Sequence, residues 1–180
     1  SEHCYCLDSL IQAERFHRAL LNQLLKINQE GITKQKIHVA IVGAGATGTE
    51  LAAQLHHVSN LARAYGMPEM SADKLQVSIL EAGPRILPAL PERIAGSARR
   101  ALTKLGIEVR ENTRVQRVDK EGFVTAEDVL IEADLMVWSA GVKAPEFLTD
   151  LNLFELNKAN QILVTPALQS TVDNKIFAIG

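Results

Sequence analysis

The sequence has few aromatic residues, no excess of basic residues and no long apolar run. Aromatic residues make up 4% of the 180 residues, and the formal net charge is −2. Proteins that bind nucleic acids carry a basic face or aromatic rings on which bases stack, so no nucleic-acid partner is expected. The longest apolar runs fall far short of the roughly 20 residues that a membrane-spanning helix needs. Since no charged stretch followed by an apolar one opens the chain, no signal peptide is indicated, and we expect a soluble, cytoplasmic protein.

Cysteine is also scarce, and the motifs of several enzyme classes are missing. The two cysteines, Cys4 and Cys6, are separated by one residue, which is too close for an ordinary disulfide framework. We interpret them as two incidental reduced thiols, with metal or redox chemistry of the pair as the alternative. No metal site is predicted, because the histidines are scattered over segments that share no face. There is no G-x-S-x-G, no Cys-x-x-Cys and no Walker lysine, so the chemistry of these motifs is not indicated.

The apolar pattern predicts one domain of mixed helices and strands. Hydrophobic residues make up 47% of the chain, enough for one core. Apolar spacings of three and four predict helices over 7–29, 46–65 and 91–105, with a short one near 145–151. Strands are predicted over 37–42, 75–80, 107–110, 115–119, 123–126, 129–132, 135–138, 162–164 and 176–179. This order predicts an α/β fold: a three-layer, Rossmann-like NAD(P)-binding domain whose parallel sheet is flanked by helices and a small antiparallel crossover meander.

A glycine-rich turn, GAGATG, follows the strand predicted over 37–42 and opens the next helix. This context strengthens an otherwise weak G-x-G-x-x-G pattern. Gly43 permits the tight turn, Gly45 lets a pyrophosphate approach the backbone, and Gly48 lets the helix pack against the sheet. The helix N-terminus offers unpaired N–H groups and a positive dipole to the phosphates. The turn therefore predicts a dinucleotide site, against the alternative of a turn kept only for packing.

An acidic residue at the end of the second strand is expected to bind the adenosine ribose, and Glu81 occupies that place. It lies further from Gly43 than is usual, because the helix and the loop between them are long. A carboxylate there favours NADH, since it repels the extra phosphate of NADPH. Arg85, four residues on, complicates this preference, because its side chain could reach a phosphate. A solvated loop carboxylate is the alternative interpretation of Glu81.

Two further segments are candidates for the nicotinamide end. Glu50 is placed in the first turn of the phosphate-binding helix, where a carboxylate that merely favours the dipole is the alternative. Ser139-Ala140-Gly141 follows a later parallel strand, at the sheet edge where ligands bind in such folds. Its small residues would let the nicotinamide lie against backbone, and a plain turn between strand and loop is the alternative. The chain has one dinucleotide fingerprint, and a flavin would need a second.

Four stretches resemble the NADH-binding domain of type II NADH dehydrogenases, the single-subunit NADH:quinone oxidoreductases that pump no protons. They are GAGATGTELAAQL, SILEAGPRILPALPE, LMVWSAGVKAP and KIFAIG. The first is shared with all flavoprotein reductases that have two dinucleotide domains, whereas EAGPRILP with WSAGVKAP is more specific. The opening CLDSLIQAERFHRALLNQ resembles the helix that leads from the flavin domain into the NADH domain. The departure is mild: Ala-Gly-Ala-Thr stands where relatives often carry Gly-Gly-Pro-Thr.

The resemblance implies roles for individual residues. It matches Glu81, with Ala82 beside it, to the ribose site and Val115 to a backbone contact with adenine. It matches Glu50 to a residue near nicotinamide and flavin, and Ala140 and Gly141 to the turn beneath the nicotinamide. The pyrophosphate loop is matched by Gly43, Gly45, Ala46, Thr47 and Gly48. It implies hydride transfer from NADH to FAD and on to a quinone. These residues hold and orient the donor, and no catalytic residue is expected in the fragment.

The resemblance also implies that much of the working protein lies outside this chain. Residues 1–36 would lead in from a missing FAD domain, 37–165 would form the NADH-binding domain, and 166–180 would begin the return to the FAD domain. The fragment is expected to bind NADH without turnover. It is also expected either to self-associate or to be partly disordered at 1–6 and near Gly180, with a homodimer left open. The full protein is expected to be peripheral on the cytoplasmic face of the inner membrane.

Three other interpretations stay open from the sequence. The first is a related flavoprotein reductase that serves ferredoxin, nitrite or sulfide:quinone chemistry. The second is a non-catalytic module that senses NAD(H). The third, that the fingerprint binds the adenosine of FAD, is disfavoured because such a fingerprint normally opens the chain.

Overall fold

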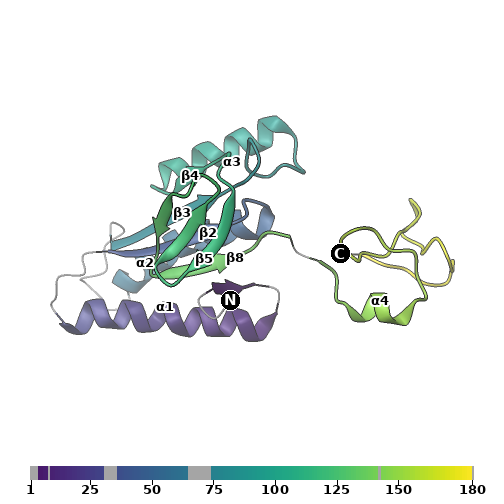
Figure 1. Cartoon of the computed structure of the whole chain (residues 1–180), viewed down its shortest axis with the longest axis horizontal. Helices are drawn as coiled ribbons and strands as arrows, with labels where there is room; N and C mark the ends of the chain where they lie inside the picture. The colour runs from purple at the N-terminus through teal and green to yellow at the C-terminus, as the bar shows by residue number, and fades with distance from the viewer. Residues whose placement is uncertain (1–3, 8, 31–35, 65–73, 142, 180) are drawn as a thin grey trace. The chain divides into compact units, whose positions relative to one another are not determined.

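The computed structural model describes residues 4–7, 9–30, 36–64, 74–141 and 143–179 (Figure 1). The chain forms two compact units, Ser1–Ala140 and Gly141–Gly180, and each is described by itself. The domain bounds predicted at residues 36 and 165 stay predictions. None of the helices described is long and apolar enough to cross a membrane.

A parallel five-stranded sheet forms the centre of the first unit. Its strands are β1 (Cys4–Cys6), β2 (Ile37–Val42), β3 (Leu75–Leu80), β4 (Glu108–Arg110) and β8 (Leu135–Trp138). They lie in the order β1-β8-β2-β3-β4, and every neighbouring pair is parallel. Because the central strands are covered on both faces, β2 is apolar at every position except His38, and β3 at every position except Gln76 and Ser78. All their carboxyl ends therefore meet at one edge of the sheet.

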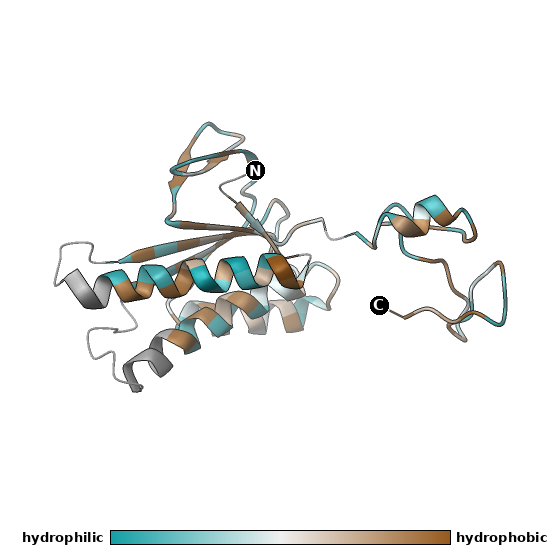
Figure 2. Cartoon of the chain, turned by 90° about the horizontal axis from the view of Figure 1, so that it is seen from below, coloured by the Kyte–Doolittle hydropathy of each residue, from teal (hydrophilic) through white to brown (hydrophobic). Residues whose placement is uncertain are grey.

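Three helices cover one face of this sheet: α1 (Leu10–Glu30), α2 (Ala46–Ala64) and α3 (Glu92–Lys104). Each presents an apolar stripe at helical spacing; in α1 this stripe consists of Phe16, Leu20 and Leu24. In Figure 2 brown residues recur along the helices and along the strands. The core on this face consists of Phe16, Leu20, Leu24, Ile37, Val39, Ile41, Ala44, Ala52, Leu55, Leu75, Val77, Ile79, Ile86, Leu87, Ala95, Leu102, Ile107, Leu135 and Val137.

A small antiparallel sheet covers the other face. It is the meander of β5 (Val115–Asp119), β6 (Gly122–Thr125) and β7 (Leu130–Glu132), in that order. Phe123, which is fully buried, packs with residues from β2, β3 and β8 into a second core. Helices, parallel sheet and meander make three layers, so the predicted fold class is confirmed.

The N-terminal strand was not predicted. The sequence placed a helix from residue 7, whereas Cys4–Cys6 pairs with Met136–Trp138 at the edge of the sheet and α1 begins at Leu10. Three residues carry too little pattern for a strand to be seen, and only the neighbouring β8 decides that they extend. α2 is described to Ala64, and the predicted end of this helix at residue 65 lies outside the described residues.

The second unit has little regular structure. It contains α4 (Phe147–Leu151), near the short helix expected from the sequence. The strands predicted over 162–164 and 176–179 are wrong: their residues form only single bridges, Leu156 with Ile162, Val164 with Ser170 and Gln169 with Phe177. Asn160 and Leu168 adopt left-handed backbone conformations, with φ of 60° and 64°. Such residues reverse the chain before an extended run can form.

Candidate functional site

The predicted glycine turn, the predicted acidic residue and the predicted small-residue turn lie at the same edge of the parallel sheet. Gly43 follows β2, Glu81 follows β3 and Ser139 follows β8. Since β8, β2 and β3 are neighbours in the sheet, the three segments lie side by side at its carboxyl edge. The structure thus brings together residues that are almost 100 positions apart in the sequence. This is the edge at which ligands bind in open α/β sheets.

The three glycines of the turn have different surroundings. Gly43 has φ of +98°, and a Cβ on it would lie 2.7 Å from the backbone nitrogen of Ala140. A Cβ on Gly48 would overlap the carbonyl oxygen of Gly43 and lie 2.6 Å from Ser139 Oγ. Gly45 has no atom within 4 Å of the same position. Two glycines are therefore required by packing, whereas the middle one leaves open space beside the backbone, as a cradle for a phosphate requires.

Hydrogen bonds join the turn after β8 to the glycine turn. The backbone N–H of Ser139 donates to the carbonyl of Val42 at 2.9 Å, and the Ser139 hydroxyl lies 2.9 Å from the carbonyl oxygens of Val42 and Gly43. Trp138 Nε1 donates to the carbonyl of Ala140 at 3.0 Å. The Trp138 ring packs edge-on to Phe123, with centroids 6.3 Å apart. These contacts hold the turn near Ala140 at a set distance from the glycine turn.

The Glu81 carboxylate stabilises the glycine turn through hydrogen bonds. Its Oε2 accepts from the backbone N–H of Ala44 at 2.9 Å, and its Oε1 accepts from that of Gly83 at 2.8 Å. A carboxylate has about four acceptor positions, so capacity remains for ribose hydroxyls. The carboxylate thus links the ends of β2 and β3, and it is half-buried. The sequence predicted its place but not its contacts with the glycine turn.

Arg85 is occupied within its own loop. Its guanidinium donates to the carbonyls of Leu90 and Pro88, both at 2.9 Å, and to that of Leu87 at 3.4 Å. The loop returns to the glycine turn, because the N–H of Leu87 donates to the carbonyl of Ala44 at 2.7 Å. Arg85 therefore stabilises its own loop in this structure. It is less available to reach the extra phosphate of NADPH, which was the sequence-based argument against a preference for NADH.

The first turn of α2 faces the open space beside Gly45. Ala46 and Thr47 are exposed, and the N–H groups of a first turn have no acceptor within the helix. Glu50 was predicted in the first turn of this helix, and that placement was slightly wrong. Because α2 begins at Ala46, Glu50 lies just beyond the first turn, which contains no acidic residue. Its side chain is exposed.

The remaining predicted residues lie around this edge with fewer contacts. Ala82 is exposed beside Glu81. Val115 begins β5 and packs against the second core, together with Trp138 and Ala140. Gly141 has φ of 69° and is the first residue of the second unit, so its position relative to the other residues is not described. Trp138 was not predicted as a site residue, although WSAG was recognised as a motif. Ser139 was predicted only as part of the small-residue turn, without the contacts of its hydroxyl with the glycine turn.

The described titratable groups with shifted pKa values lie away from the glycine turn. Burial, with a contribution from Cys6, raises the pKa of Cys4 to about 11. Burial lowers the pKa of His38, whose Nε2 lies 2.9 Å from Ser78 Oγ. Hydrogen bonds to Asp119 and Asp128 raise the pKa of Arg117. Within the described residues, no group of three histidine, cysteine, aspartate or glutamate side chains could hold a metal ion.

Cavities elsewhere do not carry this chemistry. One of about 730 Å³ lies within the second unit, lined mainly by apolar side chains such as Leu148, Ile162 and Leu168. Another, of about 480 Å³, lies at the amino ends of β2, β3 and β4. The assignment of the candidate site at the carboxyl edge rests on the turn geometry.

Comparisons with known proteins agree with this geometry. The model of the pyridine nucleotide-disulphide oxidoreductase family matches residues 1–180. A type II NADH:quinone oxidoreductase of Haemophilus influenzae is 38% identical over the whole chain, which covers 44% of that protein. The type II NADH:quinone oxidoreductase Ndh of Mycobacterium tuberculosis is 32% identical over 78% of the chain, and the match covers 32% of that protein. The structure of NDH2 from Plasmodium falciparum in complex with NADH superposes with a TM-score of 0.74 at 23% identity, over 99% of this chain and 39% of that one. The chain thus spans less than half the length of these relatives.

Proposed function

The chain belongs to the pyridine nucleotide-disulphide oxidoreductase family, and we propose that it is the NADH-binding part of a type II NADH:quinone oxidoreductase. Its relatives from Haemophilus influenzae and Mycobacterium tuberculosis, both type II NADH:quinone oxidoreductases, support this assignment within the family. The chain covers under half of each, so the proposal assigns it nucleotide binding and leaves flavin and quinone binding to the rest of such a protein.

The observation that carries the proposal is the contrast among the three glycines. Gly43 and Gly48 are closed in by backbone and by Ser139, whereas Gly45 has open space beside it. Packing alone explains the first two and does not explain the third. A glycine with nothing against it, at the N-terminus of a helix and beside exposed N–H groups, suits the close approach of a pyrophosphate.

The residues of the chain then have distinct roles along the dinucleotide. The N–H groups around Gly45, Ala46 and Thr47 bind the pyrophosphate, and Glu81 accepts from the adenosine ribose hydroxyls while it holds Ala44. The backbone near Val115 lies at the adenine end. Ala140, held by Trp138, supports the nicotinamide end. No group here moves a proton, and the contribution of these residues is positioning.

In the complete protein, a bound flavin would supply the chemistry of hydride acceptance and of electron transfer to a quinone. We place Glu50 on the side of the site that such an acceptor would approach. The complete protein would then act as a peripheral protein on the cytoplasmic face of the inner membrane, where its quinone substrate is dissolved. A homodimer is compatible with this arrangement.

Equilibrium binding of NADH and NADPH to the 180-residue chain tests the proposal. Trp138 is the chain's single tryptophan, and its emission overlaps the absorption of reduced nicotinamide, so energy transfer reports binding. NADH should bind more tightly than NADPH, and Glu81→Ala should weaken NADH binding by removing both the ribose contact and the brace on Ala44. Glu92→Ala, which changes an exposed carboxylate on α3, serves as a control. Equal affinity for both nucleotides, or no effect of Glu81→Ala on NADH binding, would contradict the proposal.

A further inference from the structure

Several arginines lie in the loop after β3 and on α3, β4 and β5, and most of their guanidinium groups have partners. Arg85 donates to three carbonyls of its own loop. Arg110 pairs with Glu108 at 2.8 Å, and Arg99 pairs with Glu111 at 2.9 Å. Arg117 lies within 3.3 Å of both Asp119 and Asp128. These cations are already held, and moving any of them toward a ligand would break existing contacts.

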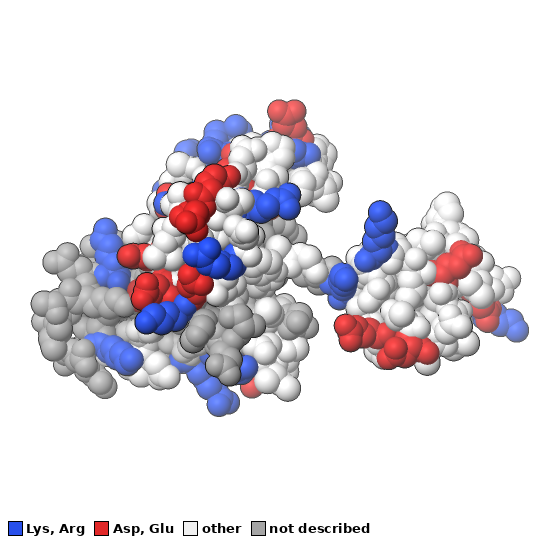
Figure 3. Space-filling view, in the orientation of Figure 1, with Lys and Arg blue, Asp and Glu red and all other residues white. Residues whose placement is uncertain are grey.

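Arg114 differs from them. Its side chain is exposed, and its guanidinium makes no hydrogen bond or ion pair with the residues that the structure describes. Figure 3 shows basic groups on this unit interspersed with acidic ones. Because Glu111, three residues before it, already pairs with Arg99, Arg114 remains a cation without a partner among the described residues.

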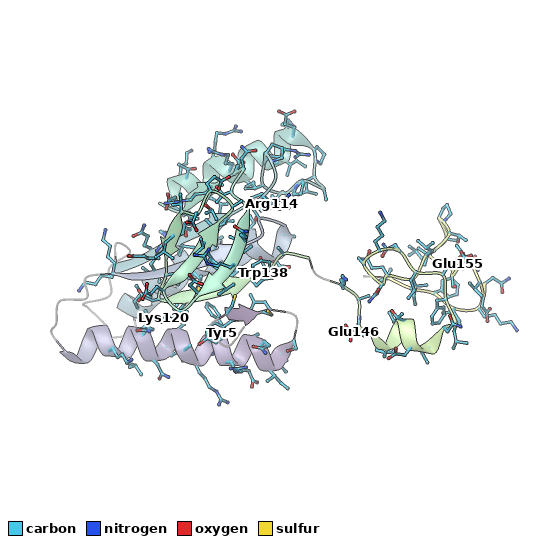
Figure 4. All side chains as sticks on the ribbon, in the orientation of Figure 1. Tyr5, Arg114, Lys120, Trp138, Glu146 and Glu155 are labelled. Atoms are coloured by element: carbon cyan, nitrogen blue, oxygen red, sulfur yellow. The ribbon has the colours of Figure 1, made fainter. Side chains whose placement is uncertain are left out.

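The backbone of Arg114 is nevertheless fixed next to Glu81. The N–H of Thr113 donates to the carbonyl of Glu81 at 2.7 Å, one residue before Arg114. The carbonyl of Arg114 accepts from the N–H of Ala126 at 2.8 Å. Val115, the next residue, packs into the second core, and side chains alternate in an extended chain. The Arg114 side chain, labelled in Figure 4, therefore leaves a backbone fixed close to Glu81 and is exposed.

We infer that Arg114 is a specificity residue of this site, and that it binds the 2′-phosphate of NADPH, which Glu81 repels. The inference rests on the proposed function. A phosphate monoester carries a charge of about −1.5 to −2 at pH 7 and forms strong, often bidentate, hydrogen bonds with a guanidinium. The 2′-hydroxyl of NADH is uncharged and gains little from the same cation. Preference for NADH is then the balance of Glu81 against Arg114 rather than the effect of Glu81 alone.

Because of this balance, the effects of substituting Glu81 and Arg114 on NADPH affinity should not be additive. Removal of Glu81 leaves Arg114 unopposed, so Glu81→Gln should raise NADPH affinity while one of the two bonds to Ala44 and Gly83 is retained. Removal of both residues should abolish that gain. The contribution of Arg114 should also shrink at high salt, because an exposed charge pair is screened.

The experiment measures the affinities of NADH and NADPH for the 180-residue chain by energy transfer from Trp138. It uses the wild type, Arg114→Ala, Glu81→Gln and the double variant. Lys104→Ala, which removes an exposed cation at the far end of α3, is the control for net charge. The melting temperature of each variant shows that the fold is kept. Arg114→Ala should weaken NADPH binding about fivefold or more and NADH binding less than twofold.

The outcomes separate this inference from the proposed function. If the wild type binds NADH and Arg114→Ala changes both nucleotides equally, or neither, the inference is wrong and the proposed function stands. If Glu81→Gln raises NADPH affinity as much without Arg114 as with it, the inference is also wrong. If the wild type binds neither nucleotide, both fail for this chain. The inference is supported if Arg114→Ala weakens the binding of NADPH alone and Lys104→Ala does not. This effect of Arg114→Ala should fade as the salt concentration rises from about 50 to 500 mM.

Discussion

Two alanine substitutions in the glycine turn should affect different properties: Gly48→Ala should lower the stability of the fold, and Gly45→Ala should lower the affinity for NADH. At Gly48 a methyl group would overlap the carbonyl oxygen of Gly43 and press against Ser139 Oγ. Both neighbours belong to the hydrogen-bonded contact between two turns, so the clash can be relieved only by a backbone shift. At Gly45 the same methyl meets no atom within 4 Å, and the backbone of Gly45 is not in the left-handed region.

The magnitudes follow from these surroundings. Overpacking in a closed region costs about 1–3 kcal/mol, and the higher helix propensity of alanine offsets up to about 1 kcal/mol of that. Gly48→Ala should therefore lower the free energy of unfolding by about 2 kcal/mol, which corresponds to a fall of about 4–8 °C in the melting temperature. Gly45→Ala should change it by no more than about 0.5 kcal/mol, but its methyl occupies the space proposed for the pyrophosphate. NADH affinity should fall about tenfold or more, or about 1.4 kcal/mol.

Urea unfolding followed by Trp138 emission measures the first effect in the unit that contains the turn, and NADH titration measures the second. Wild-type stability in Gly48→Ala would refute the account of the contact between the turns. Wild-type NADH affinity in Gly45→Ala would refute the phosphate cradle. The reasoning also fails if the two variants lose stability equally, because their surroundings would then not differ as described.

Three further predictions concern the rest of the first unit. Trp138→Phe removes the N–H that donates to Ala140 while it keeps a ring against Phe123, so circular dichroism during urea unfolding should show a loss of about 0.5–1.5 kcal/mol, and an unchanged midpoint would contradict this. Because burial lowers the pKa of His38, the unfolded chain takes up that proton first as the pH falls below 6.5, so stability should decrease on acidification. His38→Gln should make the urea midpoint less dependent on pH between 7.5 and 5.5, and an unchanged slope would count against it. Because the pKa of Cys4 is raised from 9.0 to about 11, its thiol should be alkylated more slowly in the folded chain than in urea at pH 8, which mass spectrometry measures. The free energy of unfolding should also fall as the pH rises from 9 to 11, because the unfolded chain loses this proton first. Equal alkylation rates in the folded and unfolded chain would argue against burial of Cys4.

The order of the helices and strands in the first unit was predictable because it depends on local pattern. Strands covered on both faces read as continuous apolar runs, and the predicted bounds of β2, β3, β5 and β8 agree with the structure. Pattern failed where it was short or where neighbours decide. Cys4–Cys6 became a strand only because β8 offers it an edge. In the second unit, left-handed residues such as Asn160 reverse the chain, so single bridges form where strands were predicted.

The sequence by itself determined that a glycine turn, an acidic residue and a small-residue turn follow parallel strands, and so that they share an edge. Only the tertiary structure decided how each residue is used there. It engaged Arg85 with carbonyls of its own loop, left Arg114 without a partner among the described residues and placed the Ser139 hydroxyl against the glycine turn. A strand's pattern records which face is buried, but the partner of a long polar side chain depends on groups that are distant in the sequence. These partners exist only after the strands have assembled.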